Sequence, residues 1–382
     1  MATTFGPGRQ GGVFRGWDRF DYVLVLSAVG LVVFGLLLIY SGTYRTYEGP
    51  PASFSNPVTK QAIFAIFGIV MMLAVSKVDY HYLTHYSVVL WGISILSLIA
   101  ILLMGHSAYG STRWFNLGPI QIQPSEFAKL ATILLLANFF SEHGGDAKDL
   151  RTLLMSLAIV APCVGLVFIQ PDLGTSIVFV AVWLGVVLVA GVSRRHLFIL
   201  AAVGLAVLPF AWTFAVADYQ IERISVLVDP EEDPLDAGYN VIQSQIAVGS
   251  GQLTGKGLTN GEQTQLGYLR VATKDFIFSL QAEELGFVGS MVMFTLFIVL
   301  LMRGIRAAQI AGDISGQLVA VGIVILILMQ AFINIAVNLS LFPVTGIPLP
   351  LVSQGGSSLV SIFVSLGVLQ SIIMRHRAYR QT

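Results

Sequence analysis

The feature that most constrains this chain is a series of apolar stretches, each long enough or nearly long enough to cross a lipid bilayer. The hydrocarbon core is about 30 Å thick, and a helix rising about 1.5 Å per residue crosses it with about 20 apolar residues. Hydrocarbon leaves backbone groups unpaired unless the segment is helical, and no alternating pattern indicates a β-barrel. We therefore predict an all-α polytopic membrane protein. The ten predicted spans are residues 21–40, 61–78, 86–104, 124–140, 152–169, 173–190, 197–216, 276–301, 314–341 and 351–374.

The composition excludes several classes of function. Only 11% of the 382 residues are Asp, Glu, Lys or Arg, whereas soluble domains carry about 25%. The 21 basic and 21 acidic residues cancel, so no net field attracts nucleic acid. Cys163 is the single cysteine, which excludes an internal disulfide or a Cys-based zinc site. The six histidines are dispersed, and we expect no protein-held metal site.

The Lys and Arg residues of the connecting segments predict the orientation. With both termini in the cytoplasm, thirteen of them lie inside and seven outside. We therefore expect one integral membrane domain over 1–382, with residues 1–20 and 375–382 cytoplasmic. Residues 217–275 form a long extracytoplasmic loop between the seventh and eighth helices. The N-terminus lacks a signal-peptide cleavage pattern.

The long loop contains three patterns of its own. Residues 229–236 are acidic and are most simply a solvated turn, and residues 239–248 predict a short surface helix. The glycine-rich run that follows does not match a phosphate-binding P-loop, because Ser250 replaces a required glycine and Gly257 replaces the Ser or Thr after Lys256. We predict no nucleotide site, and expect these glycines to allow close approach of the backbone to the membrane surface or to a polar ligand.

Ionisable residues near the outer ends of the spans are functional candidates, because charge inside a membrane is costly. Glu126 and Lys129 are spaced i, i+3 and predict an ion pair, which is more often structural than catalytic. Asp172 follows a proline and either caps the sixth helix or serves a site. Asp275 ends the long loop, with Glu283 and Glu284 expected about two turns deeper in the eighth helix.

Further candidates lie close to these carboxylates in the predicted topology. Arg113 and Trp114 precede the fourth span, and Arg45 follows the first. A tract rich in Pro and Gly, residues 343–358, interrupts the last apolar region. Its backbone donors at the start of the last helix form either an anion cradle or a plain turn. The residues of this cradle are Ser353, Gly355, Gly356 and Ser357.

Six motifs together resemble the SEDS family (shape, elongation, division, sporulation), in order along essentially the whole chain. They are Ser-Thr-Arg-Trp-Phe-Asn-Leu-Gly-Pro at 111–119, Gln-Pro-Ser-Glu-Phe-Ala-Lys at 123–129, Gln-Pro-Asp-Leu-Gly-Thr at 170–175, Lys-Asp-Phe-Ile-Phe at 274–278, Ala-Glu-Glu-Leu-Gly at 282–286, and the tract at 346–358. Residues 265–269 and the Pro-Leu-Pro-Leu-Val-Ser run are more similar to the elongation members than to the division members.

The resemblance implies a peptidoglycan glycosyltransferase that polymerises lipid II at the outer face of the bacterial cytoplasmic membrane. It also implies a class B penicillin-binding protein transpeptidase as partner, within the elongation machinery. The essential acidic residue of the family carries over to Asp275, and other motif residues carry over to Trp114, Glu126, Lys129 and Asp172. Two departures concern residues 270–274, where family members commonly read Pro-Glu-x-His-Thr, and Gln354, where a Tyr is frequent.

The mechanistic hypothesis assigns Asp275 as the general base that takes a proton from the acceptor sugar. Arg113, Lys129 and Arg45, or a divalent cation such as Mg²⁺ or Mn²⁺, would neutralise the diphosphate of the leaving group. Glu126 would hold Lys129, and Asp172 would order the site. A single displacement would invert the anomeric centre.

Two other functions stay open at this point. A lipid II flippase is favoured by Gln330, Asn334 and Asn338, which share one face of the ninth helix and could line a pathway. A scaffold for cell-wall enzymes would need no acidic residue at the outer mouth. The concentration of charges in the outer half of the membrane favours chemistry over transport.

Overall fold

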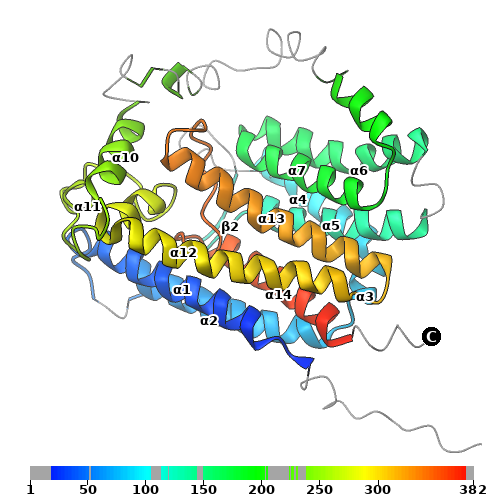
Figure 1. Ribbon diagram of the computed structural model, residues 1–382, viewed down its shortest axis with the longest axis horizontal. Coiled ribbons are helices and arrows are strands. Elements are labelled where there is room, and N and C mark those ends of the chain that lie inside the picture. Colours follow the sequence, from blue (N-terminus) through cyan, green and yellow to red (C-terminus); the bar gives the residue numbers. More distant parts are fainter. Residues whose placement is uncertain are drawn as a thin grey trace, which may run out of the picture.

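The protein is a bundle of long, roughly antiparallel helices, seen in a computed structural model (Figure 1). The structure describes residues 19–50, 53–104, 113–118, 120–143, 149–202, 204, 223, 225–227, 229–230 and 238–375. Its helices are α1 (Tyr22–Thr43), α2 (Pro57–Lys77), α3 (Tyr80–His85), α4 (Ser87–Met104), α5 (Pro124–Glu142), α6 (Leu150–Ile169), α7 (Leu173–Val189), α10 (Tyr239–Ser250), α11 (Glu262–Gln265), α12 (Ile277–Ile310), α13 (Ile314–Asn338) and α14 (Gly356–Arg375).

Helices lie at nine of the ten predicted spans, which confirms the all-helical fold. Within the described residues, six helices (α1, α2, α6, α12, α13 and α14) are long and apolar enough to cross a membrane. Of the predicted span 197–216, only residues 197–202 and 204 are described, and these are helical. The last helix begins at Gly356 and not at 351, because prolines and glycines occupy the tract before it. The complete set of ten spans stays a prediction.

Polar residues fix where several helices begin. Asp21 and Asn56 accept backbone N–H groups at the starts of α1 and α2, and Asp313 does so for α13. Such caps satisfy donors that the first helical turn leaves free. Side chains at the boundaries therefore set the lengths of the apolar segments between them.

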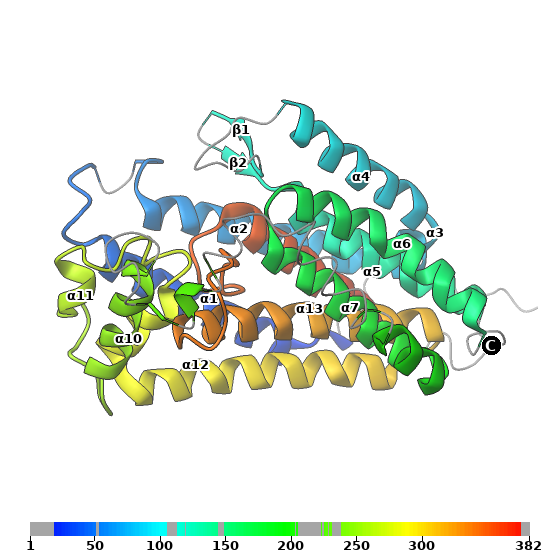
Figure 2. The same cartoon turned by 90° about the horizontal axis from the view of Figure 1, so that it is seen from above.

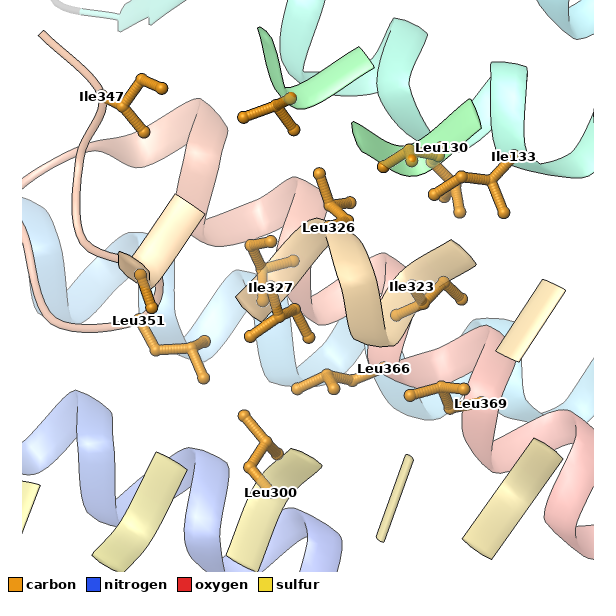
Figure 3. Packing of buried hydrophobic residues seen from close by; sticks show 14 of the residues in the cluster. Leu130, Ile133, Leu300, Ile323, Leu326, Ile327, Ile347, Leu351, Leu366 and Leu369 are labelled. Atoms are coloured by element: carbon orange, nitrogen blue, oxygen red, sulfur yellow. The ribbon is translucent and has the colours of Figure 1, made fainter. Parts of the chain in front are cut away.

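The core is centred on α13, which packs between α5, α12 and α14 (Figure 3). Ile323 and Leu326 of α13 are buried and lie among leucine and isoleucine side chains from the neighbouring helices. Helix α2 packs along α14, where the ring of Phe363 lies against Gly68. Lipid tails are as apolar as these side chains, so the hydrophobic effect contributes little to helix association in a bilayer. Close packing therefore holds the helices together.

One end of the bundle carries most of the non-helical segments that the structure describes, and we call it the site end. Helices α1 and α13 end there, and α2, α5, α7 and α14 begin there (Figure 2). It also holds α10, α11 and a hairpin of β1 (Phe115–Leu117) and β2 (Ile120–Ile122), in which Phe115 pairs with Ile122. This hairpin was not predicted. Both ends of the described chain lie at the opposite end of the bundle (Figure 1).

Helix α12 is broken at Gly286, whose φ of 61° and ψ of −157° are not helical. This combination of angles is essentially restricted to glycine. Residues 277–285 therefore form a separate short helix before the spanning part of α12 begins. Glu283 and Glu284 belong to this short helix and come before the break, so their predicted depth in the eighth helix stays a prediction. The break itself was not predicted.

The glycine-rich run of the long loop packs directly on this short helix. A Cβ at Gly255 would lie 2.2 Å from the carbonyl oxygen of Glu284. Lys256 N–H donates to the carbonyl of Glu283 at 3.0 Å, and Gly257 N–H donates to that of Glu284 at 2.9 Å. These carbonyls belong to the last turn of the short helix, where carbonyl groups have no N–H donor within the helix. Gly251 and Gly255 thus approach protein backbone, and the predicted approach of the run to the membrane surface or to a polar ligand stays a prediction.

The two glutamates tie the long loop to the bundle. The carboxylate of Glu283 accepts the N–H and hydroxyl of Thr264, at 3.2 and 3.0 Å, and lies 3.4 Å from Nζ of Lys256. Ser41 at the end of α1 donates its hydroxyl to Glu284 at 2.5 Å. The predicted helix at 239–248 is confirmed as α10, while only residues 229–230 of the acidic stretch 229–236 are described.

Candidate active site

Asp275 lies at the site end, in the turn that leads into α12, and its side chain is half-buried. Its backbone carbonyl accepts hydrogen bonds from Nδ2 of Asn334, at 3.0 Å, and of Asn338, at 2.9 Å. Gly346 lies beside the carboxylate, because a Cβ at this glycine would be 3.9 Å from Oδ2 of Asp275. The carboxylate is thus held between α13 and the tract that follows it.

Asn338 joins three elements at this point. Its Oδ1 accepts the N–H and the hydroxyl of Ser279, at 2.9 and 2.7 Å. Ser244 of α10 donates its hydroxyl to the carbonyl of Asn338 at 2.8 Å. The transport interpretation placed Gln330, Asn334 and Asn338 along a pathway. The amides of Asn334 and Asn338 are engaged in holding Asp275, whereas the buried amide of Gln330 has no hydrogen-bond partner.

Four charged residues surround Asp275. Burial raises the pKa of this carboxyl above its ordinary value, the positive charges of Lys274, Arg223 and Arg113 oppose that rise, and the negative charge of Asp172 adds to it. A carboxylate whose pKa is raised is a stronger base while it remains ionised at neutral pH. The surroundings therefore suit proton abstraction beside an anionic ligand.

Arg113 and Asp172 meet at the turn between α6 and α7. Arg113 donates from Nε to the carbonyl of Gln170 at 2.8 Å and also to the carbonyl of Pro171, and its Nη1 lies 4.0 Å from Oδ1 of Asp172. Asp172 accepts the N–H of Thr175 at 3.1 Å, which confirms the helix cap. The negative charge of Asp172 also acts on the carboxyl of Asp275. Asp172 therefore fits both interpretations that the sequence left open, a helix cap and a residue of the site.

The tract between α13 and α14 supports the segment that carries Asp275. Ser353 donates its hydroxyl to the carbonyl of Lys274 at 2.6 Å. Gln354 donates its N–H to the carbonyl of Thr273 at 2.9 Å and accepts the hydroxyl of Thr273 at 2.8 Å. The residue that departs from the family pattern therefore has a defined contact two residues before Asp275.

The predicted anion cradle is only partly available. The N–H of Gly355 donates to Oε1 of Gln61 at 3.1 Å, so this donor is already used, contrary to the prediction. A Cβ at Gly356 would lie 2.6 Å from the ring of Phe64, which shows that this glycine permits tight packing. The hydroxyl of Ser357 is buried and has no hydrogen-bond partner.

Glu126 and Lys129 form the predicted ion pair, with 2.7 Å between Oε1 and Nζ. Both side chains are buried, at 2% and 1% exposed, and Ser361 of α14 donates to Oε2 of Glu126 at 3.2 Å. The pair therefore joins α5 to α14. A contact between Lys129 and a diphosphate would require this buried pair to open.

The remaining predicted residues are less constrained. Trp114 is half-buried just before β1, and Arg45 is exposed in the turn after α1. Their roles in substrate binding stay predictions. Sequence reasoning did not assign Arg223, which donates to the carbonyl of Val344 at 2.6 Å and whose charge reaches Asp275. It lies in the long loop, where no pattern distinguishes it from other basic residues.

A metal ion held by the protein does not fit this arrangement. Among the described residues, no three His, Cys, Asp or Glu side chains are grouped so as to hold one. Asp275 is surrounded by three cationic side chains, which oppose a second positive centre. The predicted Mg²⁺ or Mn²⁺ ion, carried by the diphosphate itself, stays a prediction.

The chain matches a family described as cell cycle proteins, FtsW/RodA/SpoVE, over residues 22–378. It is 36% identical to the peptidoglycan glycosyltransferase MrdB of Escherichia coli over 358 residues, covering 93% of this chain and 94% of the relative. It is 39% identical to stage V sporulation protein E of Bacillus subtilis over 357 residues, covering 92% and 96%.

Two solved structures share the fold. One, described as showing structural coordination of polymerization and crosslinking by a peptidoglycan synthase complex, has a TM-score of 0.78 and 29% identity, covering 95% of this chain and 99% of the other. The rod shape determining protein RodA of Thermus thermophilus has a TM-score of 0.69 and 27% identity, covering 96% and 99%.

The chain therefore belongs to the FtsW/RodA/SpoVE family of polytopic membrane proteins. The resemblance to the SEDS family that the motifs predicted is confirmed, and so is its similarity to RodA members.

Proposed function

We propose that this protein is a peptidoglycan glycosyltransferase that polymerises lipid II, with Asp275 as general base. The observation that carries the proposal is the setting of this carboxylate, which is half-buried, fixed through its backbone by two asparagines, and surrounded by cationic side chains. Similarity along nearly the whole chain to relatives named peptidoglycan glycosyltransferases supports the same activity.

The proposed step is one displacement at the anomeric carbon of the donor sugar. The acceptor GlcNAc 4-hydroxyl attacks this carbon, a new C–O bond forms, and the C–O bond to the lipid diphosphate breaks. Asp275 takes the hydroxyl proton, and the diphosphate leaves with the bonding electron pair. An α-linked donor thereby gives a β-linked product.

Positive charge at the site stabilises the departing diphosphate. Lys274, Arg223 and Arg113 are all close enough to act on Asp275 electrostatically, so an anion beside that carboxylate would experience the same charges. Asp172 lies beside Arg113, with 4.0 Å between Oδ1 and Nη1. The hydrogen bonds of Arg113 to two backbone carbonyls restrict its movement during the reaction.

The location and partners complete the proposal. The protein lies in the bacterial cytoplasmic membrane with its site end outside, as the distribution of Lys and Arg predicts. Its partner is a class B penicillin-binding protein transpeptidase, within the elongation machinery. The solved peptidoglycan synthase complex that shares this fold supports such an assembly.

The test is polymerisation of purified lipid II by the full-length protein in detergent, comparing wild type with Asp275→Asn. We expect glycan from wild type and none from the variant, while lipid II binding persists. The matched control is Asp313→Asn, at the opposite end of the bundle, where asparagine can still cap α13. Polymer at near wild-type yield from Asp275→Asn would refute the assignment. A lipid II flippase would leave the substrate unchanged in detergent, where there are no compartments.

A further inference from the structure

A second feature of the site end is an apolar groove of about 360 Å³ between α2, the β-hairpin, α5 and α14. Its walls include the rings of Phe54, Phe64, Phe67 and Phe127. Its volume lies within the range of ligand pockets, about 300–1,000 Å³. The mechanism above uses none of these side chains.

The groove opens on the surface that faces lipid. Ile63 and Phe67 line it and are 44% and 52% exposed, on a helix that is apolar enough to span a membrane. Ser357 also lines the groove, and its buried hydroxyl has no hydrogen-bond partner. An apolar ligand can therefore enter the groove laterally from the bilayer. Inside the groove, the hydroxyl of Ser357 is free to donate a hydrogen bond to it.

Two lysines lie where the groove approaches the active site. Nζ of Lys60 is 5.7 Å from the ring centroid of Phe54, which is part of the groove wall. The ammonium groups of Lys60 and Lys274 are near enough to repel each other. In the described part of the chain, neither lysine forms a salt bridge.

Hydrogen bonds explain why these lysines come together. Gln61, next to Lys60, donates to the carbonyl of Ser353 at 3.0 Å and accepts the N–H of Gly355 at 3.1 Å. Ser353 donates in turn to the carbonyl of Lys274 at 2.6 Å. The start of α2 is thus tied to the segment that carries Asp275, and Lys60 and Lys274 lie on the two segments that this link joins.

We propose that the groove and the two lysines form a binding site for a polyprenyl diphosphate, with the hydrocarbon chain in the groove and the diphosphate between Lys60 and Lys274. A diphosphate offers two anionic phosphates to two cations, and lysine binds phosphate as a point charge. The inference rests on the proposed function, because it places the lipid part of a lipid-linked sugar substrate. It assigns Lys60, which lies outside the family motifs, to substrate binding.

The site also gives Lys274 a role. A cation next to the general base lowers the basicity of that base, which works against proton abstraction. With a diphosphate bound between Lys60 and Lys274, part of that positive charge is neutralised by the ligand. Binding of the lipid diphosphate therefore restores basicity to Asp275.

The test measures binding and not polymerisation, so that it stands apart from the proposed function. The probe is undecaprenyl diphosphate without sugar, added to the full-length protein in phosphatidylcholine nanodiscs. We expect Lys60→Gln to weaken binding at least tenfold, and Lys60→Arg to restore most of it. We expect Arg306→Gln, an exposed cation at the opposite end of the bundle, to bind as wild type.

The hydrocarbon part is tested by a matched pair on α2. Ile63→Trp places an indole in the groove and is expected to weaken binding at least tenfold, whereas Ile66→Trp, 65% exposed and outside the groove, is expected to bind as wild type. Wild-type binding by both Lys60→Gln and Ile63→Trp would overturn the proposal. Equal competition by phosphatidylglycerol would also overturn it, because the groove would then hold ordinary lipid. Polymerisation by Asp275→Asn with these binding results unchanged would refute the proposed base alone.

Discussion

Replacing Asn338 by leucine, a side chain with the same number of non-hydrogen atoms and the same branching, removes the amide that joins α13, the short helix and Asp275. Asn338 is fully buried and makes four hydrogen bonds of 2.7–2.9 Å to Ser279, Asp275 and Asn334. Such bonds in membrane proteins average about 0.6 kcal/mol, so four give about 2.4 kcal/mol. The N–H of Ser279 then also lacks its acceptor, which costs about 1–3 kcal/mol.

We therefore expect Asn338→Leu to lower the free energy of unfolding by about 3–5 kcal/mol. Polymerisation should fall as well, because the carbonyl of Asp275 loses one of its two amide donors. A misplacement that costs about 1.4 kcal/mol in the transition state lowers the rate tenfold. The loss should appear in kcat at saturating lipid II and not in KM, since Asn338 acts through Asp275 and does not contact substrate.

The same helix offers a matched control in Gln330, which is 1% exposed and whose amide has no hydrogen-bond partner. Gln330→Leu replaces an unsatisfied buried amide by an apolar side chain and should be neutral or stabilising. Thermal unfolding in detergent and lipid II polymerisation measure both variants. Equal losses in the two variants would refute the reasoning, because the effect would then come from altered packing of α13 and not from the hydrogen bonds of Asn338.

Two further predictions follow from the charges of the site. Polymerisation should fall as the pH drops through the raised pKa of Asp275; Lys274→Gln should move this acid limb to higher pH, and Asp172→Asn to lower pH, in a pH–rate profile. If both variants shift the acid limb in the same direction, or if neither shifts it, the assignment of Asp275 as the base is contradicted. Glu126→Gln should destabilise the bundle by about 3–5 kcal/mol, because it leaves Lys129 buried without its partner. Changing both residues to methionine should recover most of that loss in thermal unfolding, whereas an unchanged melting temperature in Glu126→Gln would show that the pair is not structural.

Features that depend on neighbouring residues could be predicted from the sequence. The Glu126–Lys129 pair and the cap by Asp172 both follow from spacings of three residues along a helix. The helices follow from apolar length alone, since lipid imposes helical structure on long apolar segments.

Features that depend on distant contacts could not be predicted. The bonds of Asn338 join residues 59 and 94 positions apart, and no local pattern specifies which carbonyl or hydroxyl such an amide will meet. The break at Gly286 could not be foreseen, because a single glycine is tolerated inside a helix unless neighbouring segments fix it in another conformation. Here the glycine-rich run fixes it, by bonding to the last carbonyls before the break.

The break at Gly286 separates two tasks within one continuous stretch of chain. The short helix before it is anchored by the loop and by Asn338, so the position of Asp275 does not depend on the spanning part of α12. That spanning part exposes side chains such as Val288 and Ile298 along its outer surface. These positions can change to suit a different lipid or a different neighbouring helix while the reacting group keeps its place.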